Sequence, residues 1–302
     1  MTSSIGIRIY KVSIHKVRNR TELPFDTEGV LTPPPQFLTN FAATHSNANE
    51  DPELERSWFF EAKDVKSPDS SKGYVHYGTF GFESDFIDTK TKTHNYRRKT
   101  TDVEVIPLFY EFWHPNGSDH AFAAFQSFHG RSCIQLITSR MQEVFAKKNP
   151  GFALLFKKLL PVDTDGGIYQ SAPVKSLRLI KRNASSDIAD RYLSSRPTDA
   201  VDFELIITAK RKGILGKLGS LSNTLKNGKG GVATHDGISF EEAVAEIQVG
   251  GRMRRVGIFG HNGDAGVIDL SDAIQRGHDG HPTFASMVKE SGELLKDFQA
   301  VL

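Results

Sequence analysis

The segment VEVIPLFYEFWHPNGSDHAFAAFQSF, residues 103–128, decides the fold class of this chain. Two apolar, aromatic-rich runs, Val103–Trp113 and Ala121–Phe128, have the composition of β-strands. The polar residues between them include Asn116-Gly117, a dipeptide that favours tight turns between antiparallel strands. The segment therefore predicts two neighbouring antiparallel strands.

More strands are expected on both sides of this pair. Ile5–Val17 alternates apolar and polar residues, which predicts a strand with one buried face. Gly250-Gly251 separates two further apolar runs and favours a hairpin between them. The other predicted strands, separated by turn-forming residues, are Ser57–Val65, Tyr74–Phe82, Val174–Ile180, Asp202–Ala209, Ala243–Val249 and Arg252–Phe259.

Helices are expected where the hydrophobic period lengthens. Over residues 131–148, apolar side chains recur at helical spacing until Asn149-Pro150-Gly151 stops the run. The segment Phe284–Phe298 has one apolar face, and Thr283 is placed to cap its start. A further short helix is expected over Ser186–Leu193.

The order of these elements predicts the fold class and a division of the chain. We expect an α+β fold with mainly antiparallel sheets, a central helix and a C-terminal amphipathic helix. Residues 18–53 are polar and rich in proline, which predicts a long loop. A boundary near residues 161–167 would separate an antiparallel β-rich domain, residues 1–165, from an α+β domain, residues 166–302. A single domain is the alternative.

Composition limits the chemistry and the location of the protein. The 302 residues include 38 Lys and Arg against 36 Asp and Glu, so any affinity for nucleic acid must come from local patches. Cys133 is the only cysteine and lies in an apolar pattern, so we expect a buried thiol in a reducing compartment. The sequence shows neither a signal peptide nor a run of about 18 apolar residues. We therefore expect a cytoplasmic protein without a transmembrane segment.

Several catalytic motifs are absent from the sequence. Gly216-Lys217 and Gly228-Lys229 lack both the earlier glycine and the following Ser or Thr of a phosphate-binding P-loop. There is no G-x-S-x-G nucleophile elbow, no H-E-x-x-H zinc helix and no ordered dinucleotide fingerprint. The sequence predicts neither a metal site nor a cofactor, apart from Mg²⁺ in one alternative below.

Positive charge gathers in three segments and along a predicted strand that carries Lys175, Arg178, Lys181 and Arg182. KTKTHNYRRK, residues 90–99, lies between two predicted strands, and AKRKGILGKLGSLSNTLKNGKGG, residues 209–231, contains no acid. The third segment follows Gly250-Gly251. Cations interleaved with aromatic residues are typical of surfaces that follow a nucleic-acid backbone. The predicted nucleic-acid contacts are Lys90, Lys92, Tyr96, Arg97, Arg98, Lys99, Lys210, Arg211, Lys212, Lys217, Arg252, Arg254 and Arg255.

Glu61 and Lys63 raise a second functional hypothesis. Residues two apart on a strand point to the same side of a sheet. In magnesium-dependent nucleases of the Glu-x-Lys type, the acid binds the metal and the lysine positions or activates the attacking water. Catalysis by Glu61 and Lys63 is therefore an alternative function, and it needs a second carboxylate nearby. A simple exposed ion pair explains the same pattern.

The segment 209–231 also allows a third hypothesis. Ile214, Leu218, Leu221 and Leu225 are spaced as one face of a helix, which glycines within the segment weaken. We expect a mobile basic insertion over residues 210–235 that becomes ordered against nucleic acid, a protein partner or another copy of the chain. The third function is therefore a protein-interaction or oligomerisation module.

Two stretches resemble a recurring arrangement in uncharacterised prokaryotic proteins. They are RRKTTDVEVIPLFYEFWHP, residues 97–115, and HAFAAFQSFHGRSCIQLITSRMQEVF, residues 120–145. In that arrangement one strand reads Ile-Pro-Leu-aromatic, a second ends near Phe-Gln, and a helix follows. The chain thus resembles members of bacterial anti-phage defence islands, which implies a context and supplies no site residue. Our leading hypothesis is a non-enzymatic, defence-associated protein that binds nucleic acid through basic loops, as a sensor or a subunit of a complex.

Overall fold

The computed structural model of the chain describes residues 5–67, 70–128, 130–159, 169–184, 201–226, 233–235, 237–249, 252–259, 266–300 and 302. Within these residues the fold is α+β, as predicted, with four helices and a large share of antiparallel strands. The chain divides into two compact units. Unit 1 contains Met1–Ile9, Lys158–Ala273 and Gly292–Leu302, and unit 2 contains Tyr10–Lys157 and Ile274–Ser291.

The sheet of unit 2 contains the strands that residues 103–128 predict. Tyr110 lies opposite Phe125 in an antiparallel pair, which confirms the prediction. The strand order is the second half of β1 (Ile5–Lys16), β8 (Ala121–Phe128), β7 (Glu104–Trp113), β4 (Ser70–Thr79), β3 (Arg56–Ser67) and β2 (Asn49–Asp51), and β9 (Phe152–Lys158) pairs with β1.

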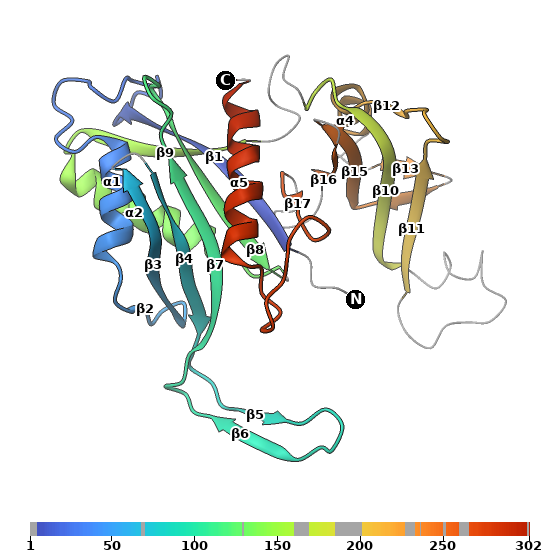
Figure 1. Cartoon of the computed structure of the whole chain (residues 1–302), viewed down its shortest axis with the longest axis horizontal. Helices are drawn as coiled ribbons and strands as arrows, with labels where there is room; N and C mark the ends of the chain where they lie inside the picture. The colour runs from blue at the N-terminus through green and yellow to red at the C-terminus, as the bar shows by residue number, and fades with distance from the viewer. Residues whose placement is uncertain are drawn as a thin grey trace. The chain divides into compact units, whose positions relative to one another are not determined.

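One face of this sheet carries the core of unit 2. Two helices, α1 (Pro34–Thr44) and α2 (Ile134–Lys148), pack over that face (Figure 1). The ring of Phe37 on α1 meets that of Phe145 on α2 edge to face, with 5.1 Å between the centroids. Phe60 of β3 is buried in the same cluster. An aromatic-rich core agrees with the 21 Phe of the sequence.

The prediction of a loop over residues 18–53 is wrong, because α1 and β2 lie within it. Pro34 and Pro35 occupy the first turn of α1, where proline removes no helical hydrogen bond. Phe37 and Phe41 follow one helical turn apart, and both are buried. The proline-rich start concealed a short amphipathic helix.

The opposite face of the unit 2 sheet meets the first half of α5 (Phe284–Gln299). The ring of Phe284 lies 5.6 Å from that of Tyr74 and 5.9 Å from that of Phe109, between centroids. Thr283 Oγ1 accepts a hydrogen bond from the Ser286 N–H at 3.4 Å, which confirms the predicted helix cap.

A separate hairpin is inserted between β4 and β7. β5 (Ser84–Ile87) and β6 (His94–Arg98) pair with each other and project past the ends of β4 and β7 (Figure 1). We call residues 81–102 the arm. The sequence predicts only a basic connection here, because the many polar residues of the segment mask the alternation of a strand.

Unit 1 is built on a second run of antiparallel strands. The predicted hairpin is confirmed, with Val249 of β15 opposite Arg252 of β16. The strand order is β11 (Val201–Thr208), β10 (Pro173–Ala184), β15 (Glu242–Val249), β16 (Arg252–Phe259), β17 (Ile268–Asp269) and the first half of β1, and β12 (Gly216–Lys217) also pairs with β10. β13 (Ala233–His235) and β14 (Ile238–Phe240) form a small separate pair.

The second half of α5 and α4 (Leu218–Lys226) complete unit 1. Phe298 of α5 is buried against Tyr169, whose hydroxyl donates to Asp297 at 3.0 Å. Burial raises the pKa of Tyr169. The predicted helix over residues 186–193, the turn at residues 250–251 and the boundary near residues 161–167 lie outside the described residues. None of the described helices is long and apolar enough to cross a membrane.

Candidate functional site

The basic segment over residues 209–217 follows one edge of β10 in unit 1. β11 and β12 pair in turn with this edge, because β15 occupies the other. The Ala209 N–H donates to the Lys175 carbonyl and the Leu215 N–H to the Val174 carbonyl, each at 2.8 Å. The residues between these two bonds are therefore held as a loop beside β10.

This loop brings five cations together. Lys175 Nζ donates to the Gly213 carbonyl at 3.0 Å, so the ammonium group lies against the loop. Lys217 stands opposite Pro173 in the register of β12 and β10 and is exposed. The remaining three cations are consecutive and exposed. We call the cluster the basic corner: Lys175, Lys210, Arg211, Lys212 and Lys217.

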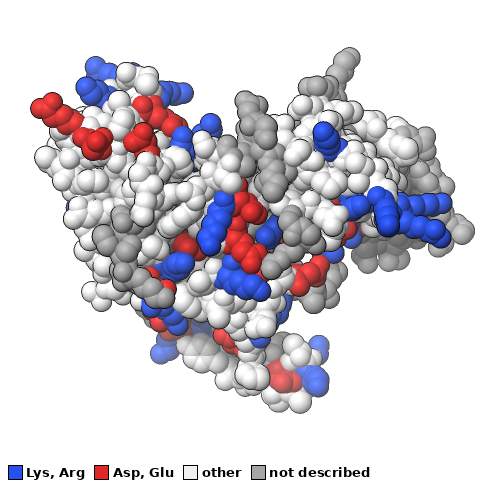
Figure 2. Space-filling model, turned by 45° about the horizontal axis from the view of Figure 1, so that its top comes forward, with Lys and Arg blue, Asp and Glu red and all other residues white. Residues whose placement is uncertain are grey.

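No acidic side chain pairs with the basic corner within the described residues. Further along β10 the cations are neutralised, since Arg178 lies 3.7 Å from Glu204 and Arg182 lies 2.7 Å from Asp202. Figure 2 shows Lys and Arg side chains gathered on the side where Figure 1 places β10 to β12, whereas positive and negative groups intermingle over the rest of the face that it draws. The positive charge is local, as a net charge of only +2 requires.

The backbone of the loop is closed by a tight turn. The Gly213 N–H donates to the Lys210 carbonyl at 2.9 Å. Within the turn Arg211 has a φ of 49°, in the left-handed region that glycine normally occupies. The turn therefore holds an exposed guanidinium where the backbone itself would favour a residue without a side chain.

Helix α4 follows directly and anchors the loop. Leu218 is fully buried and Leu221 is half-buried, so these two members of the predicted leucine face pack inward. Ile214 lies before the helix and is 52% exposed, outside its predicted helical position. A Cβ added to Gly219 would lie 2.9 Å from Gln170 Oε1, so this glycine permits close packing. Ordering of the segment by a ligand stays a prediction.

The arm carries another group of predicted contacts. Lys90 and Lys92 lie at its tip and Lys99 near its root, all exposed and without an ion pair among the described residues. Tyr96 is 50% exposed, and its hydroxyl donates to Asp102. The tip therefore presents cations, and the body of the arm presents an aromatic ring.

The two arginines of the arm have structural partners. Arg97 donates from Nη2 to Glu83 Oε2 at 2.9 Å on an exposed face. Arg98 is only 2% exposed, its guanidinium donates to the Thr79 carbonyl, and it lies 4.1 Å from the centroid of the Phe82 ring. Arg98 therefore fixes the root of the arm, and its burial leaves it no surface for a phosphate.

The third basic segment is neutralised by acids. Arg254 is 6% exposed, and its Nη2 lies 3.8 Å from Glu293 Oε2. Arg255 Nη1 lies 3.2 Å from Asp272, and its Nε lies 3.9 Å from Glu246. The side chain of Arg252 is outside the described residues. The burial of Arg254 and the acids around Arg255 do not suit contact with phosphates.

Glu61 and Lys63 share one face of β3, as predicted, with 3.4 Å between Oε1 and Nζ. Glu61 Oε2 also lies 2.8 Å from His76 Nε2, and this hydrogen bond, with help from Lys63, lowers the pKa of Glu61. The ring of Phe59 stacks on His76, and Lys63 lies over the ring of Tyr74. Within the described residues, no group of three His, Cys, Asp or Glu is placed to hold a metal ion. These contacts of Glu61 give no support to the nuclease hypothesis.

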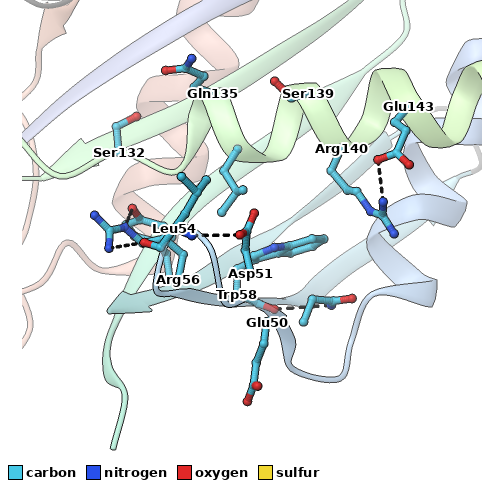
Figure 3. A pocket seen from close by; sticks show the side chains of 13 residues that line it. Glu50, Asp51, Leu54, Arg56, Trp58, Ser132, Gln135, Ser139, Arg140 and Glu143 are labelled. Carbon is cyan, nitrogen blue, oxygen red and sulfur yellow. Dashed lines mark hydrogen bonds and ion pairs between the residues drawn. The ribbon is translucent and has the colours of Figure 1, made fainter. Parts of the chain in front are cut away.

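Unit 2 contains an open pocket of about 710 Å³ between α2 and the turn that joins β2 to β3 (Figure 3). Both arginines of its lining have hydrogen-bond partners. Arg56 Nε donates to the Tyr77 hydroxyl at 2.9 Å, and Arg140 Nη1 donates to Glu143 at 2.6 Å. The two walls come from residues 49–58 and 132–143, so no local sequence pattern revealed the pocket.

No protein-family model matches the sequence, and a search among curated proteins finds no significant match. The function is therefore inferred from the chemistry of the chain's own residues. Four of the predicted contacts form the basic corner together with Lys175, and its cations gather on one strand edge without acidic partners in the described residues.

Proposed function

We propose that the protein binds nucleic acid, with the basic corner in contact with the phosphate backbone. The observation that supports the proposal is the gathering of five cations on one edge of β10, unpaired with any acid in the described residues. Cations that neutralise phosphates release condensed counterions, and this release favours binding whatever the base sequence. Arg211 adds a planar guanidinium that can donate two parallel hydrogen bonds to one phosphate.

Contacts of this kind set the expected strength and mode of binding. A small number of phosphate contacts, without base contacts, gives dissociation constants on the order of 10⁻⁴ to 10⁻⁶ M at physiological salt. The proposed role is therefore recognition of the backbone of DNA or RNA, with no chemical step.

Fluorescence anisotropy with labelled single-stranded and duplex DNA and RNA tests this proposal. The variant Lys210→Ala/Arg211→Ala/Lys212→Ala removes three charges from the basic corner. The matched variant Lys147→Ala/Lys148→Ala/Lys157→Ala removes three charges from unit 2. We expect the first variant to weaken binding about tenfold or more, because each lost phosphate contact lowers the affinity.

The control variant should bind within about twofold of the wild type, because screening limits the reach of distant charges. Equal losses of affinity in the two variants would show that binding depends on the total charge of the protein and not on the basic corner. Absence of binding by the wild type to all four ligands at low salt would contradict the proposal outright.

The resemblance to proteins of anti-phage defence islands suggests a sensor or complex subunit in the bacterial cytoplasm, and this stays a prediction. Its test is phage plating on bacteria that express the wild type or the basic-corner variant. We expect protection by the wild type and its loss in the variant. Protection that survives in the variant would separate a defence role from nucleic-acid binding.

A further inference from the structure

Two features of unit 2 have no part in the proposed function: the arm and the pocket beside α2. The arm is a thin hairpin with a large exposed apolar surface. Phe86 and Tyr96 face each other across its strands, with ring centroids 6.1 Å apart, and are 45% and 50% exposed. The neighbouring Ile87 is 53% exposed. An isolated two-stranded hairpin gains little stability by itself, so this surface suits a partner.

The tip of the arm is built to present two lysines. Asp88 Oδ1 accepts hydrogen bonds from the N–H groups of Lys90 and Thr91 at 2.8 and 2.7 Å. The Lys92 N–H donates to the Asp88 carbonyl at 3.0 Å, and Lys92 has a φ of 60°. These bonds fix the backbone of the turn, so Lys90 and Lys92 extend from a defined loop with no ion pair among the described residues.

The segment at the rim of this pocket, residues 50–55, carries the opposite charge. Glu50 and Asp51 line the pocket, with the Glu50 side chain directed away from α2 (Figure 3), and Glu53 and Glu55 lie in the following turn, none in an ion pair among the described residues. Arg56 and Arg140 also line the pocket. Leu54 on the rim is 56% exposed. Figure 3 shows Asp51 and Leu54 on the side of the pocket that faces α2. The size, about 710 Å³, suits several side chains of a partner.

The root of the arm lies beside the mouth of this pocket. The Phe80 N–H donates to the Glu55 carbonyl at 3.2 Å, and Glu55 is next to Arg56 of the pocket lining. From Gly81 to Asp88, where the turn of the tip begins, the chain spans at most roughly 23 Å, at about 3.3 Å per residue. The paired strands of the arm carry its tip away from the root, so an arm tip at this pocket would come from another molecule.

We propose that two copies of the chain associate through unit 2, each arm placing its tip in the pocket of the other. Lys90 and Lys92 would meet the acids around Glu50 and Glu53, and the apolar side chains of the arm would cover Leu54. Because the root of each arm lies beside the pocket of the same copy, one two-fold axis can relate the two arm–pocket contacts. The proposal uses residues of unit 2 alone and does not depend on the basic corner.

Sedimentation velocity of the full chain, freed of nucleic acid as judged by absorbance, tests the proposal. We expect a dimer in the wild type. The tip variant Lys90→Glu/Lys92→Glu and the rim variant Glu50→Lys/Glu53→Lys should each raise the dimer dissociation constant about tenfold or more, because like charges then face each other. The combined fourfold variant should regain much of the affinity, because its charges are reversed on both sides.

Asp26→Lys/Glu28→Lys is the matched control, since it reverses two exposed acids of unit 2 outside the pocket and should leave the dimer unchanged. A wild type that stays monomeric at about 100 μM overturns the proposal. Tip variants that remain dimeric, or a fourfold variant with no recovery, also overturn it. If the tip variant loses affinity for duplex DNA while the mass is unchanged, the arm is a nucleic-acid contact and the proposal fails.

Discussion

Arg211 combines an unfavourable backbone conformation with an exposed cation, so its two roles can be separated. Arg211→Gly relieves a left-handed conformation that costs a non-glycine residue about 1–2 kcal/mol. Glycine also makes the unfolded chain more flexible, which offsets about 0.5–1 kcal/mol of that gain. We expect the free energy of unfolding in urea to change by less than about 1 kcal/mol while affinity for nucleic acid falls. Unchanged affinity would remove Arg211 from the interface.

Glu61 gives a pH dependence that follows from its partners. His76, then Lys63, hold its pKa below the ordinary value of 4.5 in the folded chain. A lowered folded-state pKa gives stability that is present above pH 4.5 and lost as the pH falls through the folded-state value. The wild type should therefore exceed Glu61→Gln in free energy of unfolding at neutral pH, with a difference that shrinks below pH 4.5. The difference should be small because the side chain is 46% exposed.

Urea unfolding of both forms at several pH values measures this difference. A difference that does not change with pH would contradict the account of Glu61 as a carboxylate held by His76 and Lys63. The matched substitution Asp26→Asn alters an exposed carboxylate outside this cluster and serves as the control.

At the scale of residues, the sequence predicts charge but not burial. Arg97 and Arg98 are adjacent and chemically identical, yet Arg97 is exposed and Arg98 is 2% exposed. The difference arises because alternate residues of β6 point to opposite sides, one toward solvent and one toward the arm's root. Cys133 was predictable as a buried thiol, because an apolar helical pattern surrounds it, and it is 1% exposed.

At the scale of elements, α4 anchors the basic corner. Leu218→Ala removes a fully buried side chain, so we expect a loss of about 2–4 kcal/mol in free energy of unfolding. Ile214→Ala is the matched control, because the same segment leaves that side chain 52% exposed and the loss should be small. Urea unfolding followed by circular dichroism measures both. Equal losses would show that α4 does not pack as described.

The sequence predicts a helix or strand well where its apolar residues recur with one clear period and turn-forming residues mark its end. The pair β7 and β8 follows from two apolar runs around Asn116-Gly117, and α2 follows from its helical spacing. The arm was missed because Thr and charged residues interrupt its alternation, and α1 was missed because Pro33-Pro34-Pro35 resembles a loop. The basic corner was predicted in part: the loop cations were named as contacts, but the place of Lys175 beside them depends on strand pairing.

At the scale of the whole molecule, association through unit 2 would place two basic corners in one particle. Two linked sites bind a long polyanion more tightly than either alone. The variant Lys90→Glu/Lys92→Glu should therefore weaken binding to a long duplex more than to a short oligonucleotide that fits one basic corner. Anisotropy with the two lengths measures the ratio. Equal weakening on both lengths would place the tip lysines in direct contact with the nucleic acid.

The dependence of affinity on salt tests the central claim most directly. Each phosphate neutralised on a duplex contributes about 0.9 to the slope of the logarithm of the binding constant against that of the salt concentration. We predict a negative slope for the wild type that becomes shallower by roughly 3 in Lys210→Ala/Arg211→Ala/Lys212→Ala and unchanged in Lys147→Ala/Lys148→Ala/Lys157→Ala. The same slope for the wild type and the basic-corner variant would contradict the proposed interface.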